Sequence, residues 1–234
     1  MLQKTLTPLI VSLSLIAGTA HAQDAEARKL RSLDYLRTQG ITGLPNLPAR
    51  QDERASARRT TDEVTDRALA LLVVSVAGAA HDTAASLPLE QEFGLRNEFT
   101  IFEDAYLDNP QPPDQDHFNM SWRFEAAYVL LWAIGIYGDL PAPGTLVSED
   151  KIISDIRGIG AKDIRSMASL RPQSELLDAA DLLYRYDLAC IDSWQTGAPY
   201  PPGTDCEIVM EWRYALDWLT VAPAQDWDNV SLDY

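Results

Sequence analysis

The stretch Ala68-Leu-Ala-Leu-Leu-Val-Val-Ser-Val-Ala-Gly-Ala-Ala80 decides the fold class. It is apolar around the whole circumference of a helix, which is typical of a helix buried at the centre of a domain. Thr60 and Glu63 have the spacing of a capping box, so we expect the helix to begin there. At about 13 residues, the apolar run is shorter than the roughly 20 residues that a membrane-spanning helix needs.

Helical patterns continue on both sides of this core segment. Before it we expect a charged amphipathic helix from Asp24 to Gln39 and a loop from Gly43 to Arg59. After it we expect helices from Leu95 to Leu107, from Ser121 to Tyr137 and from Ser174 to Ser193, two short helices from Glu149 to Leu170, a last helix carrying Ile208 to Leu219, and an irregular tail from Asp226. No segment alternates as a strand does. The sequence therefore predicts an all-α fold, a single helical array of about seven or eight helices without significant sheet.

Residues 1–22 have the pattern of a cleavable secretory signal. Lys4 supplies a positive start, the run from Leu9 to Ala17 is apolar apart from two serines, and Ala20-His-Ala22 is a small-x-small cleavage site. We expect cleavage after Ala22, a periplasmic or secreted product, and a single all-helical domain over residues 23–234. The alternative is that this segment is an ordinary buried first helix.

The chain is strongly acidic. It has 19 basic and 35 acidic residues, and loss of Lys4 with the signal leaves 18 against 35, a net charge of −17. Such a charge repels nucleic acid and anionic membranes and attracts basic proteins. We therefore expect a basic protein partner, no nucleic acid and no membrane insertion. The oligomeric state is left open.

The chain has two cysteines, Cys190 and Cys206. An even number in an exported chain favours a disulfide. The two residues fall near the end of one expected helix and the start of the next, so a bond would close a loop of about 15 residues and contribute roughly 3 kcal/mol. The alternative is two buried free thiols.

Charged residues interrupt two apolar helices. Arg123 and Glu125 lie in one, and Glu211 and Arg213 lie in the last. Residues two apart do not face each other on a helix, so each charge needs a partner elsewhere, such as Arg123 with Glu211 or Glu125 with Arg213. The leading interpretation is a structural ion-pair network. The alternatives are a ligand-binding polar pocket that also includes Trp227, and acid–base catalysis by Glu125 or Glu211.

Other patterns favour structure over chemistry. The loop at Asp114 and Asp116 and the tail from Asp226 to Asp233 offer oxygen ligands, but neither matches a calcium-binding loop, so we expect solvated helix caps and no metal or cofactor. The segment from Ile156 to Ile164 resembles a helix-hairpin-helix element. With so few basic residues nearby, we interpret it as a tight turn between helices.

Catalytic motifs are scarce. Beyond residue 22 the chain has two histidines, His81 and His117, and it lacks the nucleophile elbow, the paired-histidine zinc motif, the Cys-x-x-Cys pair and the phosphate-binding loop. This weakens the enzyme hypothesis without removing it, because a catalytic triad can be assembled from distant residues.

Three segments carry a resemblance to a known family. They are Ser121-Trp-Arg-Phe-Glu-Ala126 followed by Leu130-Leu-Trp-Ala-Ile-Gly135, then Leu176-Leu-Asp-Ala-Ala-Asp-Leu-Leu-Tyr-Arg185, and Glu211-Trp-Arg-Tyr-Ala-Leu-Asp-Trp-Leu219 leading to Trp227-Asp-Asn-Val-Ser231. Together they resemble the bacterial domain-of-unknown-function family 4272 from about residue 31 to the C-terminus. The resemblance implies a helical fold and no assigned activity.

The sequence therefore leads to two hypotheses about function. The first is an exported, acidic, non-enzymatic domain that binds another protein. The second is an envelope hydrolase or small-ligand-binding protein, with a polar pocket between the helices that contain Ser121 and Glu211.

Overall fold

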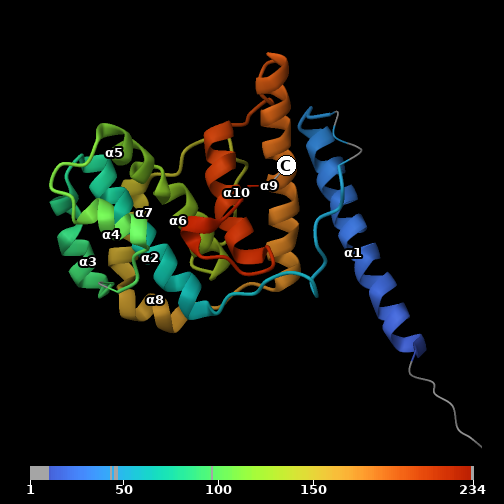
Figure 1. The fold of residues 1–234 in the computed structure, drawn as a ribbon, viewed down its shortest axis with the longest axis horizontal. Coiled ribbons are helices and arrows are strands. Elements are labelled where there is room, and N and C mark those ends of the chain that lie inside the picture. The colour runs from blue at the N-terminus through green and yellow to red at the C-terminus, as the bar shows by residue number, and fades with distance from the viewer. Residues whose placement is uncertain (1–10, 43, 45–46, 96, 233–234) are drawn as a thin grey trace, which may run out of the picture.

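The computed structural model in Figure 1 describes residues 11–234 apart from residues 43, 45, 46, 96, 233 and 234, and it describes no side chain within residues 11–23. The described residues form helices and no strand, so the predicted all-α class is confirmed. The elements are α1 (Val11–Thr38), α2 (Thr61–Ala80), η1 (Thr83–Ser86), α3 (Leu87–Phe93), α4 (Ile101–Leu107), α5 (Asp114–Ser121), α6 (Arg123–Ala133), α7 (Glu149–Ile159), α8 (Ala161–Met167), α9 (Gln173–Thr196), α10 (Cys206–Thr220) and η2 (Trp227–Asn229).

Helix α2 is the core helix that the sequence predicted. The Thr60 side chain accepts a hydrogen bond from the backbone of Glu63, and the Glu63 side chain accepts one from the backbone of Thr60, so the capping box is present. Nearly every residue of α2 from Val64 to Gly78 is buried. In Figure 1, α2 lies among the helices α3 to α8, so it supplies the centre of this part of the molecule.

Gly78 sets the close approach between α2 and α5. A methyl group at this position would lie 2.4 Å from the backbone nitrogen of Ser121 and 2.7 Å from the carbonyl oxygen of His117. Only a residue without a side chain allows two helix backbones to approach so closely. The position of α5, which carries part of the site described below, therefore depends on Gly78.

A second group of helices packs on this core. Helix α10 lies between α6 and α9, and α1 runs along the outer side of α9 (Figure 1). Arg28 of α1 donates to Asp178 of α9 at 3.0 Å, and inside α9 the buried Arg185 pairs with Asp181 at 2.8 Å. These charges are paired, as buried charges must be.

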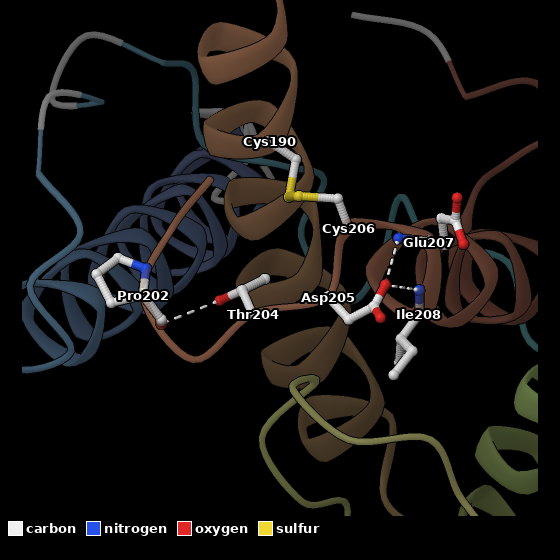
Figure 2. Close-up of a disulfide and its surroundings, with 7 residues drawn as sticks. All are labelled: Cys190, Pro202, Thr204, Asp205, Cys206, Glu207 and Ile208. Carbon is white, nitrogen blue, oxygen red and sulfur yellow. Dashed lines mark hydrogen bonds between the residues drawn. A yellow bond between two sulfur atoms is a disulfide. The ribbon is translucent and has the colours of Figure 1, made fainter. Parts of the chain in front are cut away.

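Cys190 and Cys206 form the disulfide that the sequence favoured. Their Cα atoms lie 5.8 Å apart, and the bond joins α9 to the first residue of α10 (Figure 2). Beside it, the Asp205 side chain accepts hydrogen bonds from the backbones of Glu207 and Ile208 and caps α10. The disulfide and the cap together fix the start of α10.

Several predicted helix bounds were wrong. The expected helix from Leu95 begins only at Ile101, because Gly94 ends α3 in the left-handed conformation and Thr100 with Glu103 forms a second capping box. The expected helix from Ser121 to Tyr137 spans only Arg123–Ala133. Helix α3 was not predicted, and of α5 only the caps at Asp114 and Asp116 were. The described part of α1 already includes residues 11–23, ahead of the expected start at Asp24.

The two short helices expected around Gly158 and Gly160 are α7 and α8, which meet at Gly160 with a φ of +86°. Arg157 pairs with Glu92 at 3.2 Å, and Arg165 pairs with Asp66 at 2.8 Å. This geometry is that of a tight turn between helices, with basic side chains committed to pairs inside the molecule.

Two features of the signal prediction remain untested. Lys4 and the start of the apolar run lie outside the described residues, and the side chains at the expected cleavage site after Ala22 are not described. Among the described helices, none is long and apolar enough to cross a membrane.

Candidate functional site

Arg123 and Glu211 form the cross-helix ion pair that the sequence suggested. Arg123 opens α6 and Glu211 lies in α10, and one guanidinium nitrogen of Arg123 donates to both carboxylate oxygens of Glu211, at 3.1 and 3.0 Å. The Arg123 side chain is 24% exposed and that of Glu211 is 9% exposed. Burial raises the pKa of Glu211, and the neighbouring Arg123 opposes that rise.

This pair lines a shallow hollow of about 230 Å³ between α5 and α10, called here the α5–α10 hollow. Phe118 and Met210 are about half exposed, and the rings of Phe118 and Trp122 meet edge to face at 6.2 Å. The residues that line it are Phe118, Asn119, Trp122, Arg123, Glu207, Met210 and Glu211. Exposed apolar side chains that gather around a polar group are typical of a binding surface.

Glu125 lies outside this hollow. It is fully buried, and its two carboxylate oxygens accept hydrogen bonds from the Trp212 indole at 2.7 Å and from the backbone of Val147 at 2.9 Å. Burial raises the pKa of Glu125 to about 7 against the opposing effect of these hydrogen bonds. A carboxyl group that is sealed from solvent does not reach a substrate. The hydrogen bonds of Glu125 instead link α6 to α10 and to the segment before α7.

Arg213 is also buried, at the interface of α9 and α10. It donates to Asp187, lies 3.4 Å from Asp217, and stacks 5.1 Å from the ring centre of Tyr184. The suggested pairing of Glu125 with Arg213 was therefore wrong. The two residues have different partners: Trp212 and Val147 for Glu125, and Asp187 and Asp217 for Arg213.

Trp227 is only 5% exposed and packs edge to face against Tyr214 and Trp218, at 5.0 and 5.6 Å. The Tyr214 hydroxyl donates to the carbonyl oxygen of Trp227, and the Arg123 guanidinium lies 5.7 Å from the centre of the Tyr214 ring. Tyr214 therefore connects the Arg123–Glu211 pair to the C-terminal tail. Of the five residues predicted to form a site, Arg123 and Glu211 are in direct contact, and Trp227 is linked to them only through Tyr214.

Beside Trp227 lies a second hollow of about 400 Å³, called here the tail hollow, which the sequence did not predict. It is lined by Arg59, Glu63, Asp66, Arg67, Glu98, Phe99, Thr100, Ile101, Trp218, Asp226, Trp227, Asp228 and Asn229. One signal was present in the sequence. Arg67 is the only basic residue of α2 and lies directly before its apolar run, and a charge in such a place requires a partner. In the structure, Arg67 pairs with the buried Glu103 at 2.5 Å.

A third hollow, of about 370 Å³, lies between α1, α9 and the segment 138–143. Tyr35, Trp132 and Tyr186 line it together with carboxylates that include Asp178. Asp178 is already engaged, because Arg28 and Arg31 both pair with it. The hollow is lined by none of the five residues that the sequence predicted to form a site.

The predicted oxygen-rich segments do not converge on a metal in the described part of the chain, where no three His, Cys, Asp or Glu side chains are placed to hold one. Asp114 and Asp116 lie in the first turn of α5, where negative charge stabilises a helix. His117 hydrogen-bonds the Tyr106 hydroxyl at 2.8 Å inside the protein. Asp233 lies outside the described residues.

Comparison with known proteins gives one match. The family model described as domain of unknown function (DUF4272) matches residues 28–230. No curated protein and no solved structure matches the chain.

Proposed function

Because the chain belongs to the DUF4272 family, whose description carries no activity, we propose a function from the geometry: an exported acidic protein that binds a basic partner protein without catalysis. The contact surface in this proposal is the α5–α10 hollow. The observation that carries it is the placement of the exposed Phe118 and Met210 and the partly exposed Trp122 around the Arg123–Glu211 pair.

The chemistry of the hollow suits a basic side chain on a protein surface. Phe118 and Trp122 offer ring surface to the apolar stem of a lysine or arginine, and the exposed Glu207 offers a carboxylate to its charged end. The net charge of −17 attracts such a partner over a longer range and speeds its association. The surrounding apolar side chains exclude water from the contact.

The rival hypothesis, a hydrolase or small-ligand protein, places its pocket in the same region. Two features favour the protein partner. The α5–α10 hollow, at about 230 Å³, is smaller than the roughly 300–1,000 Å³ of most ligand pockets. The two candidate acid–base groups are also poorly placed, since Glu125 is sealed and the charge of Glu211 is matched by Arg123.

We also propose that the protein acts in the periplasm or outside the cell after cleavage behind Ala22. The Cys190–Cys206 disulfide supports an oxidising compartment. The family match begins at residue 28, beyond the proposed cleavage site. Mass measurement of the protein recovered from its source tests this: a chain that begins at Gln23 is expected, and a chain that retains residues 1–22 would contradict the proposal.

Affinity capture with variants of the bait tests the binding proposal. The oxidised chain from residue 23 onward captures proteins from an envelope and culture-fluid extract of its source, in parallel with Met210→Lys and Met167→Lys. Both methionines are exposed, and both changes add the same charge, but Met167 lies on α8, away from the hollow. We expect one basic protein that is retained by the wild type and Met167→Lys, and lost with Met210→Lys.

Two results would contradict the proposal. One is a partner retained equally by all three baits. The other is turnover of a substrate that Glu211→Gln abolishes while the variant stays folded, which would establish the rival hypothesis.

A further inference from the structure

We propose that the tail hollow is a second contact for the same partner and receives a lysine or arginine side chain. This inference rests on the proposed function, because it takes the occupant to be part of a basic protein. It adds a site formed by α2, α4, α10 and the C-terminal tail.

The charges of the tail hollow favour a cation. Among the described residues that line it are five carboxylates, and both of its arginines are already engaged. Arg67 pairs with Glu103 at 2.5 Å. Arg59 donates to the carbonyl oxygens of Trp218 and Gln225 and stacks 4.3 Å from the centre of the Trp218 ring. The five carboxylates are Glu63, Asp66, Glu98, Asp226 and Asp228.

Several of these carboxylates face solvent. Glu98 and Asp226 are exposed, and Glu63 caps α2 with its side chain about half exposed. Two of the five already face an arginine, because Arg165 pairs with Asp66 at 2.8 Å and Arg59 lies 3.9 Å from Glu63. The hollow therefore carries more negative charge than its own arginines neutralise, and a positively charged side chain would reduce this repulsion.

The walls of the hollow favour a cation on an apolar stem over a free ion. Trp227 and Phe99 line it, and Ile101 at its edge is 83% exposed. The next residue, Phe102, is 65% exposed. Two exposed large apolar side chains beside an acidic hollow are typical of a protein contact, since the stem of a lysine or arginine packs on such surfaces.

The two hollows are neighbours. Tyr214 lies beneath Arg123 of the α5–α10 hollow and donates to the carbonyl oxygen of Trp227 in the tail hollow. Asp228 follows Trp227, and its carboxylate lies 3.4 Å from the backbone nitrogen of Phe102. This link through Tyr214 supports assigning both hollows to the same partner.

A small probe tests the second contact without an identified partner. N-acetyl-arginine amide is titrated into the oxidised chain from residue 23 onward, and the indole N–H signals of Trp218 and Trp227 are followed by NMR. N-acetyl-citrulline amide, which has the same shape without the charge, is the matched ligand. We expect saturable shifts of both indole signals with the arginine probe and none with the citrulline probe.

Variants locate the charge. The double change Glu98→Gln and Asp226→Asn should weaken binding of the arginine probe about fivefold, as expected for two partly exposed charge contacts. Glu53→Gln removes an exposed carboxylate that does not line the hollow and should leave binding unchanged. Equal binding of the citrulline probe, or no shift at Trp218 and Trp227, would overturn the inference.

The captured partner separates the two proposals. If Met210→Lys weakens binding of the partner but the double variant Glu98→Gln, Asp226→Asn does not, the proposed function stands and the proposed second contact is wrong. If the arginine probe binds the tail hollow but the double variant binds the partner normally, the hollow is a small-molecule site and the inference is overturned. If Met210→Lys leaves binding of the partner unchanged, the proposed function fails.

Discussion

One guanidinium nitrogen of Arg123 contacts both carboxylate oxygens of Glu211, a residue 88 positions later in the chain. The pair joins the start of α6 to the middle of α10 and lies in the wall of the α5–α10 hollow. Because Glu211 is the more buried partner, the pair is both part of the proposed binding surface and a structural contact.

Arg123→Ala should destabilise the protein by about 2 kcal/mol at neutral pH, because it leaves the carboxylate of Glu211 buried without its counter-charge. The loss should shrink at acid pH, where Glu211 takes up a proton and needs no counter-charge. Arg31→Ala is the matched control, since Arg31 pairs with Asp178 while more than half exposed and should cost well under about 1 kcal/mol. Urea denaturation of the two variants checks this, and equal losses would contradict it.

Glu125 should make the protein less stable as the pH rises toward neutrality. Its pKa is raised to about 7 in the folded state, whereas an unfolded glutamate titrates near pH 4.3. Between these values the folded state keeps a proton that the unfolded state releases, so the free energy of unfolding falls as the pH rises. The total effect of this group is on the order of 3 kcal/mol.

The comparison with Glu125→Gln isolates this effect. Urea denaturation from about pH 4.5 to about pH 8 should show the stability of the wild type falling relative to that of the variant, which has no proton to lose at this position. A difference between the two proteins that stays constant over this range would show that Glu125 is ionised throughout.

Gly78→Ala should disrupt the contact between α2 and α5. The added methyl group would lie 2.4 Å from the backbone of Ser121, so one helix must shift, at a cost of about 2 kcal/mol or more. Gly158→Ala in α7 is the control, because nothing lies within 4 Å of its added methyl group and alanine favours a helix by about 0.5–1 kcal/mol. Thermal unfolding should therefore rank Gly158→Ala at or above the wild type and Gly78→Ala well below it; the reverse order would contradict the close approach.

Loss of the Cys190–Cys206 disulfide should cost roughly 3 kcal/mol, because the bond closes a loop in the unfolded chain. A reducing agent should lower the stability of the wild type to that of the double variant Cys190→Ser, Cys206→Ser and should leave the double variant unchanged. An unfolding midpoint of the wild type in urea that is the same with and without the reducing agent would contradict this.

The core could be predicted because its signals are local. The apolar run in α2 and the capping box of Thr60 with Glu63 each lie within a few residues, and both are present as expected. The second capping box, Thr100 with Glu103, has the same pattern but was missed, since the helix that it opens is short and starts with exposed apolar residues. Short helices of this kind depend on tertiary packing, which local patterns do not report.

The candidate site could be predicted only in part. Residues two apart on a helix point in different directions, so Arg123 and Glu125 could be expected to face different neighbours, and so could Glu211 and Arg213. The sequence does not say which member of each pair faces the surface, because this depends on how α6 and α10 pack. The tail hollow was missed for the same reason, since its residues come from α2, α4, α10 and the tail.

The most direct test of the central claim is the dissociation constant of the captured and purified partner, measured by calorimetry at low and high salt. We expect Met210→Lys to weaken binding about tenfold or more, Met167→Lys to bind like the wild type, and added salt to weaken all three complexes. Equal affinities of the three proteins, or affinities that do not change with salt, would contradict the claim that the α5–α10 hollow binds a basic partner.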